Sequence, residues 1–189
     1  MRLTLVIGGA RSGKSRYALD EARRLGGDDV TCVMTAVVPS GDEEMARRIA
    51  LHRAGRPQMW ETIEEPRDVR RAISSALHSV ILLDCLTILL SNHMADSEGE
   101  AEAEGRGRRL VSELVTAARA RSGELIVVSN EVGQGIVPPY PLGRWFRDVQ
   151  GRANQDVAGA ADAVYLLVAG IPVALKGAQK GAQEAFPAS

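Results

Sequence analysis

Eight consecutive residues near the start of the chain, Gly8 to Ser15, constrain its fold more than any other feature. Their sequence, GGARSGKS, fits the pattern G-x-x-x-x-G-K-[ST], in which backbone N–H groups surround phosphate oxygens and the lysine reaches the terminal phosphates. The apolar run Leu3–Ile7 before it predicts a buried strand, and Ser15–Leu25 after it predicts a helix. This order of strand, glycine-rich turn and helix predicts a nucleotide-binding P-loop.

Two positions in this loop are candidates for the chemistry. Lys14 is a candidate catalytic residue because its ammonium group reaches the phosphates, and the Ser15 hydroxyl is a candidate ligand of Mg²⁺. The expected nucleotide-binding residues of the loop are Gly8, Gly9, Ala10, Arg11, Ser12, Gly13, Lys14 and Ser15. A P-loop protein needs a second carboxylate at the end of a neighbouring buried strand, and Asp84 closes the apolar run Val80–Leu83. We expect Asp84 to bind Mg²⁺; the alternative is an Asp that only caps the next helix.

The rest of the chain alternates short apolar runs with helical patterns, and no internal repeat is evident. Strands are expected at Val30–Thr35, Met59–Ile63, Val80–Asp84, Leu125–Ser129, Ala163–Val168 and Ile171–Leu175, with helices between most of them. This rhythm predicts an α/β fold of the P-loop NTPase (RecA-like) type, with a mostly parallel sheet covered by helices on both faces. We expect one domain over residues 1–176 and a disordered tail over residues 177–189.

Composition excludes several classes of protein. Of 189 residues, 45% are hydrophobic, which suffices for a core, and the net charge of −1 argues against a nucleic-acid binder. The apolar stretch Val80–Leu90 is too short to cross a bilayer. The two cysteines, Cys32 and Cys85, lie in apolar runs without the spacing of a zinc site or a disulfide framework, so we expect a cytoplasmic protein.

Three further segments carry weaker expectations. The acidic, glycine-punctuated Ser97–Gly107 (SEGEAEAEGRG) is expected to be a mobile loop or a fraying helix start. Pro66–Leu77 is expected to be a helix with proline in its first turn. The polar cluster Gly151–Gln155, taken alone, suggests a solvated helix face, and the glycine-rich turn Asn130–Pro138 is expected to border the nucleotide or acceptor site.

His52 lies on the expected helix Asp42–Ala54. A neutral imidazole can accept a phosphoryl or nucleotidyl group, although a partly buried structural histidine is the commoner role for such a position. The four arginines Arg47, Arg48, Arg53 and Arg56 could bind a triphosphate, although arginines are more often solvated.

Taken together, these motifs resemble the bifunctional adenosylcobinamide kinase/adenosylcobinamide-phosphate guanylyltransferase family of cobalamin biosynthesis. The resemblance covers about Leu3–Leu175. Its motifs are GGARSGKS at Gly8–Ser15, HRAGRP at His52–Pro57 followed by Trp60, Asp84, NEVGQGIVP at Asn130–Pro138, FRDVQGRANQ at Phe146–Gln155 and ADAVYLLVAGIP at Ala161–Pro172. The single motifs are of middling specificity, but the ordered set is highly specific.

The resemblance implies a two-step enzyme. A nucleoside triphosphate, ATP or GTP, phosphorylates adenosylcobinamide; GTP then guanylylates a histidine, and the GMP passes to adenosylcobinamide phosphate, giving adenosylcobinamide-GDP. By its place in the motif, His52 corresponds to the guanylylated histidine. The GTP contacts that the family implies are Thr35, Ala36, Val37, Arg53, Ala54, Gly55, Arg56, Glu64 and Asp84. The family also implies a homotrimer with active sites at subunit contacts. Asp84 stands where relatives often have Glu, and Leu51 where some carry a further histidine.

Two alternatives remain open. The chain could be a monofunctional small-molecule P-loop kinase with a structural His52, or a non-catalytic NTP-binding switch. For the two-step enzyme we also expect the bulky corrinoid to dock in an open groove near Asn130–Pro138.

Overall fold

The computed structural model describes residues 1–36, 47, 50 and 55–177 of the chain. Its strands are β1 (Arg2–Gly8), β2 (Val30–Met34), β3 (Glu61–Glu64), β4 (Val80–Asp84), β5 (Glu124–Asn130), β6 (Ala163–Val168) and β7 (Ile171–Lys176). Its helices are α1 (Lys14–Gly26), α3 (Val69–Ser75), α4 (Leu86–Met94), α5 (Glu100–Arg119) and α6 (Pro141–Ala160). The expected helix at 42–54 and the expected tail at 178–189 lie outside the described residues, apart from Arg47 and Ala50.

The seven strands form one sheet in the order β3-β2-β4-β5-β1-β6-β7. All neighbouring strands run parallel except β6 and β7, which form an antiparallel hairpin. The predicted α/β fold with a mostly parallel sheet is therefore confirmed. Parallel pairing brings the carboxyl ends of β1 to β6 to one edge of the sheet, where ligands bind in folds of this kind.

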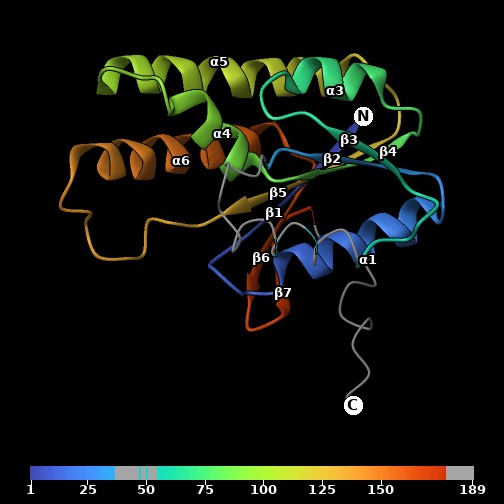
Figure 1. Ribbon diagram of the computed structural model, residues 1–189. Coiled ribbons are helices and arrows are strands. Elements are labelled where there is room, and N and C mark those ends of the chain that lie inside the picture. The colour runs from blue at the N-terminus through green and yellow to red at the C-terminus, as the bar shows by residue number, and fades with distance from the viewer. Residues whose placement is uncertain (37–46, 48–49, 51–54, 178–189) are drawn as a thin grey trace.

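Strand alternation divides the core into two layers, one on each face of the sheet. One layer contains Leu5, Leu83 and Val127 with the apolar faces of α3 to α6, and the other contains Val6, Leu82 and Val128 with α1. Figure 1 shows α3, α4, α5 and α6 stacked over one face. Of the helices that the structure describes, only α1 covers the opposite face. None of the described helices is long and apolar enough to cross a lipid bilayer.

The acidic segment 97–107 is helical from Glu100 onward, so it contains the start of a helix, which was one of the two expected alternatives; the other, a mobile loop, is wrong for most of its length. Glu100 and Glu102 lie in the first turn of α5, where the helix dipole favours negative charge. An ion pair joins Glu102 to Arg106, one helical turn later, across 2.6 Å. Gly107 is buried against α6, and a Cβ there would lie 2.5 Å from a methyl carbon of Val149. The glycine allows close helix packing and does not break the helix.

The helix expected at Pro66–Leu77 is shorter, α3 (Val69–Ser75), and Pro66 lies outside it. Asp68 caps α3 by accepting a hydrogen bond from the main-chain N–H of Arg71. The buried carboxylate of Glu65 accepts from the N–H groups of Arg67 and Asp68 and from the guanidinium of Arg71. The carboxylates of Glu65 and Asp68 thus provide hydrogen-bond acceptors for the main-chain N–H groups of the turn after β3. The helix begins three residues after the proline.

Candidate active site

The phosphate-binding loop connects β1, which ends at Gly8, to α1, which begins at Lys14. Gly13 has φ of 93° and Arg11 has φ of 56°, so the loop turns through two left-handed residues. A Cβ on Gly8 would lie 2.4 Å from the Ser12 hydroxyl oxygen and 2.8 Å from the carbonyl oxygen of Leu167. Position 8 therefore requires glycine, because the loop folds back so closely over the end of β1 that it leaves no room for a side chain.

The turn between β6 and β7 supports this loop from outside. Gly170 donates its N–H to the carbonyl oxygen of Ser12 across 2.9 Å, and a Cβ on Gly13 would lie 3.0 Å from the Cα of Gly170. Ala169 and Gly170 have φ of 50° and 83°. The sequence analysis did not assign this turn to the site; its signal is the two-residue Ala169–Gly170 spacing between two apolar runs.

Lys14 lies at the first turn of α1 and is partly buried. Its Nζ donates to the carbonyl oxygen of Gly9 across 3.1 Å. Burial lowers the pKa of Lys14, and negative charge at Cys85 and Asp84 opposes this effect. Because burial raises the pKa of the Cys85 thiol to about 11, that thiol is neutral near pH 7. The Asp84 carboxylate is then the negative charge that acts on Lys14, so the loop and the end of β4 are electrostatically coupled.

Glu64 is the last residue of β3 and Asp84 is the last residue of β4, and the two strands lie on either side of β2. Met34, at the end of β2, is paired in register with Glu64 on β3 and with Asp84 on β4. Met34 packs in the core layer beneath α1, so the alternation of strands places Glu64 and Asp84 on that same face. Glu64 is exposed. This face therefore carries two carboxylates at the edge of the sheet where the phosphate-binding loop lies: Asp84 is separated from β1 by β5 alone, and Glu64 lies farther away, on the edge strand β3.

The donor chemistry of Ser15 and Asp84 fits magnesium. A hydroxyl and a carboxylate are hard oxygen ligands, and Mg²⁺ bound to nucleotides usually takes only one or two groups from the protein. The described residues contain no group of three or more His, Cys, Asp or Glu side chains that could hold a metal ion.

Two partly buried residues, Ser12 in the loop and Arg56 before β3, have buried polar side-chain atoms without a hydrogen-bond partner among the described residues. Within the described part of the chain, neither terminal nitrogen of Arg56 has a hydrogen bond, and the same holds for the hydroxyl of Ser12. The Arg56 guanidinium is close enough to Cys32 to affect the pKa of that buried thiol. An unpaired buried guanidinium is costly, and a phosphate group would satisfy it. Arg56 is thus a strong candidate for an anion contact.

A cavity of about 450 Å³ lies between α1 and the chain just before β3. The described residues that line it include Ser15, Arg16, Gly55, Pro57 and Trp60. It joins the predicted magnesium ligand Ser15 to the predicted nucleotide contact Gly55. Its dimensions are in the range of small-molecule sites in proteins.

The side chain of Thr35 stabilises the turn that follows β4. Its fully buried hydroxyl donates to the carbonyl oxygen of Cys85 across 2.8 Å and accepts from the N–H of Cys85 at 3.0 Å. Its side chain thus holds the turn after β4, which positions Asp84. Ala36, the next predicted contact, is partly buried. The predicted site residues Val37, His52, Arg53 and Ala54 lie outside the described residues.

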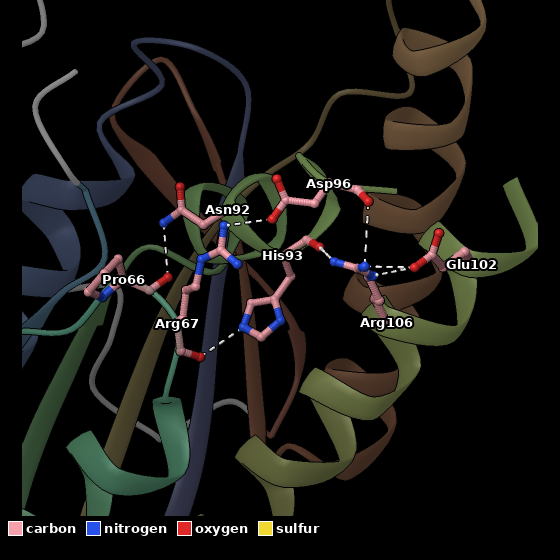
Figure 2. A network of polar contacts seen from close by, with 7 residues as sticks. All are labelled: Pro66, Arg67, Asn92, His93, Asp96, Glu102 and Arg106. Carbon is pink, nitrogen blue, oxygen red and sulfur yellow. Dashed lines mark hydrogen bonds and ion pairs between the residues drawn. The ribbon is translucent and has the colours of Figure 1, made fainter. Parts of the chain in front are cut away.

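Asn92 on α4 was missed by the sequence analysis. Its side-chain amide donates to the carbonyl oxygens of Thr35 and Pro66, each across 2.9 Å. Figure 2 shows the network around it, in which the His93 ring donates to the Arg67 carbonyl oxygen at 2.8 Å and Arg106 donates to the His93 carbonyl oxygen at 3.0 Å. These contacts connect the ends of β2 and β3 to α4 and α5.

The loop after β5 lies against the phosphate-binding loop. Glu131 donates its N–H to the carbonyl oxygen of Gly8 across 3.0 Å, and its carboxylate accepts from the N–H of Gly133 at 2.7 Å. The cluster Gly151–Gln155 was expected to be solvated, and this is wrong for Asn154, which is buried. The Asn154 side chain is buried because it has hydrogen-bond partners at the end of β5.

Comparisons with known proteins agree with this geometry. A protein-family model described as "Cobinamide kinase / cobinamide phosphate guanyltransferase" matches residues 4–175. The chain is 38% identical over 184 residues to the bifunctional adenosylcobalamin biosynthesis protein CobU of Escherichia coli (strain K12), with a match that covers 92% of this chain and 99% of the relative. It is 40% identical over 184 residues to the protein of the same name from Salmonella typhimurium, with the same coverage.

A third relative and a solved structure extend the comparison. The bifunctional adenosylcobalamin biosynthesis protein CobP of Pseudomonas aeruginosa is 39% identical over 181 residues, covering 92% of this chain and 96% of the relative. Among solved structures, an ATPase domain is similar with a TM-score of 0.50 at 15% identity, over 87% of this chain and 68% of that chain. This likeness shows that the chain shares its fold with that ATPase domain.

Proposed function

This chain belongs to the cobinamide kinase / cobinamide phosphate guanyltransferase family, and from that premise we propose that it carries out both reactions. It phosphorylates adenosylcobinamide with ATP or GTP, and then transfers GMP from GTP to adenosylcobinamide phosphate. The products of the second reaction are adenosylcobinamide-GDP and pyrophosphate. The observation that carries the proposal is a phosphate-binding loop between β1 and α1, with Lys14 at the start of α1 and Asp84 at the end of β4 on the same edge of the sheet, within a chain that matches the family over residues 4–175.

In the kinase reaction, the loop binds the triphosphate through its main-chain N–H groups and the N-terminus of α1. Lys14, released from the carbonyl of Gly9, donates to the terminal phosphates, and its positive charge stabilises the charge that develops on them. The acceptor hydroxyl oxygen forms a bond to the γ-phosphorus while the bond to the β–γ bridging oxygen breaks. The nucleoside diphosphate keeps the electron pair, and the hydroxyl proton passes to water.

Ser15 and Asp84 would hold Mg²⁺ in this site. When bound, the ion neutralises charge on the phosphate oxygens and fixes their orientation. Thr35 keeps Asp84 in position through its two hydrogen bonds to Cys85.

In the transferase reaction, His52 acts as the nucleophile. A ring nitrogen bonds to the α-phosphorus of GTP, the bond to the α–β bridging oxygen breaks, and pyrophosphate leaves with the electron pair. An oxygen of adenosylcobinamide phosphate then attacks the same phosphorus and releases the histidine. The guanidinium of Arg56 supports this assignment, because its buried terminal nitrogens have no hydrogen-bond partner among the described residues and offer positive charge four residues after His52.

The acceptor docks beside the loop Asn130–Pro138. The loop begins next to Gly8, and it carries an isoleucine, Ile136, whose side chain is 98% exposed. An exposed apolar side chain at the rim of a nucleotide site suits the hydrocarbon periphery of a corrinoid. The active assembly is a homotrimer in the cytoplasm; the exposed apolar side chains of the edge strand β7, Ile171, Val173 and Leu175, support an interface there.

The proposal is tested by product analysis. Wild-type protein with Mg²⁺, GTP and adenosylcobinamide should give adenosylcobinamide phosphate and adenosylcobinamide-GDP, identified by mass spectrometry. Lys14→Met should abolish phosphorylation. A wild-type protein that forms the phosphate but never the GDP derivative would instead be a monofunctional kinase, and one that forms neither would exclude both reactions.

A further inference from the structure

Strand β5 lies between the two strands that carry the nucleotide-binding groups. On one side, β4 ends at Asp84, which is in register with Val128; on the other, β1 ends at Gly8, which is in register with Asn130. Asn130 is therefore the last residue of a strand placed between the predicted magnesium ligand and the phosphate-binding loop. Neither the family's implied nucleotide contacts nor the kinase chemistry above uses its side chain.

The alternation of β5 indicates the face on which the Asn130 side chain lies. Ile126 and Val128 pack in the core layer under α1, whereas Leu125 and Val127 pack in the other layer. Ser129 continues the second set, because its hydroxyl donates to Asn154 on α6 across 2.7 Å. Asn130 therefore continues the first set and shares the α1 face with Asp84.

The main chain of Asn130 is fixed on both sides. Its N–H donates to the Thr87 hydroxyl oxygen at 2.8 Å, and its carbonyl oxygen accepts from the side-chain amide of Asn154 at 3.0 Å. Asn154 is held in turn by Gln150, which is fully buried and donates to its side-chain carbonyl oxygen at 3.0 Å. The next residue along the chain, Glu131, is bonded to Gly8.

The Asn130 side chain itself is only partly buried, and the structure gives it no hydrogen bond within the described part of the chain. A buried polar network therefore holds its backbone, while its side-chain amide is left for another partner. Rigid support of this kind is what a group that acts on a substrate requires.

We propose that Asn130 is a further catalytic residue of the kinase reaction. Its side-chain amide donates a hydrogen bond to the γ-phosphoryl group while that group is transferred to the acceptor hydroxyl. This inference rests on the proposed function. In the transfer, the γ-phosphorus exchanges its bond to the β–γ bridging oxygen for one to the acceptor oxygen. The equatorial phosphoryl oxygens carry the charge throughout, and a neutral donor fixed beside them stabilises the transition state.

The role predicts a difference between the two reactions. GMP transfer breaks the bond at the α-phosphorus, so the γ-phosphoryl group leaves with pyrophosphate and is never the reacting centre. A donor directed at the γ-phosphoryl group should therefore matter for the kinase kcat and much less for guanylylation of the protein.

The test compares Asn130→Ala with wild type, and uses Gln155→Ala, which removes an exposed side-chain amide from α6, as the matched control. We expect Asn130→Ala to lower the kinase kcat on the order of a hundredfold, with the Kd for GTP and the rate of labelling by [α-³²P]GTP within about threefold of wild type. Asn130→Asp, which keeps the shape but loses the donor, should lower the kinase kcat at least as far. Gln155→Ala should leave all three measurements unchanged.

Three results would overturn the inference while leaving the proposed function intact. These are a kinase kcat for both Asn130 variants within about threefold of wild type, an equal loss of kinase and guanylylation rates, or a weakening of GTP binding that accounts for the whole loss. Absence of corrinoid phosphorylation by the wild-type protein would overturn the proposed function, and this inference with it.

Discussion

Gly8 and Ser12 approach each other so closely that a Cβ on Gly8 would lie 2.4 Å from the Ser12 hydroxyl oxygen. The loop between them returns over the end of β1, and the Ser12 carbonyl oxygen is held by Gly170 of the β6–β7 turn. The shape of the phosphate-binding loop thus depends on the absence of a side chain at one position and on a hairpin far away in the sequence.

Gly8→Ala should destabilise the protein, because the added methyl group meets the Ser12 hydroxyl and the Leu167 carbonyl oxygen, 2.8 Å away. Overpacking of this kind costs about 1–3 kcal/mol. Urea unfolding of the nucleotide-free protein measures the loss. Gly9→Ala is the matched control, since a Cβ there meets nothing within 4 Å, and it should change the unfolding free energy by less than about 0.5 kcal/mol. Equal effects of the two variants would contradict the loop geometry.

Arg56→Met should make the nucleotide-free protein more stable and at the same time weaken its binding of GTP. The Arg56 guanidinium is buried without a hydrogen bond to any described residue, so its removal should raise the unfolding free energy of the nucleotide-free protein by about 1 kcal/mol. It should also weaken GTP binding on the order of tenfold, because a charge-assisted contact to phosphate is lost. Calorimetry and urea unfolding measure the two effects.

Arg119→Met, which replaces an exposed arginine at the end of α5, serves as the control for Arg56 and should change neither quantity. If Arg56→Met left GTP affinity unaltered, Arg56 would not be a phosphate contact.

Ile136→Glu should raise the KM for adenosylcobinamide on the order of tenfold, the effect of losing one buried isoleucine contact. The KM for the nucleotide should not change. Leu77→Glu provides the control, because Leu77 is also strongly exposed but precedes β4, at the opposite edge of the sheet. An unchanged corrinoid KM in Ile136→Glu would exclude docking of the corrinoid on this loop.

The stability of the protein in acid should depend on Glu65. Burial alone raises the pKa of Glu65, but hydrogen bonds from Asp68, Arg67 and Arg71 outweigh burial and hold the pKa below its ordinary value of 4.5. A carboxyl group with a lower pKa in the folded chain stabilises the fold at a pH above its unfolded pKa. That contribution is lost as the pH falls through the folded pKa.

Glu65→Gln should therefore lower stability at pH 7 and reduce the difference between pH 7 and pH 3, measured by urea unfolding at each pH. Glu113→Gln, at a partly exposed position inside α5 and away from its first turn, should keep the wild-type difference. A Glu65→Gln protein with the full wild-type pH dependence would show that this carboxylate does not contribute in the way described.

The phosphate-binding loop and the positions of the strands along the chain could be predicted because each depends on adjacent residues: eight in the loop, and short apolar runs in the strands. Asn154 could not be placed, because its partners Ser129 and Asn130 are 25 and 24 residues away in the sequence. Its burial depends on the way α6 packs across the end of β5.

For a related reason, the sequence left open whether the segment at the start of α5 is a loop or the beginning of a helix. Glycine and acidic residues are typical of loops, yet Gly107 is buried where α5 meets Val149 of α6, and Glu102 is paired with Arg106. Thr35 shows the converse, since a residue expected to contact nucleotide uses its hydroxyl to hold the turn after Asp84. The composition of a segment does not indicate which residues its side chains will contact in the folded protein.

The central claim, a GMP–histidine intermediate on His52, is tested most directly by incubating the protein with [α-³²P]GTP and Mg²⁺ and isolating the chain. We expect the wild-type protein to carry a label that is labile to acid and stable to alkali, as a phosphoramidate is, and to carry none from [γ-³²P]GTP. His52→Ala should lose the label while it still phosphorylates adenosylcobinamide. Labelling of His52→Ala at the wild-type level would contradict the account.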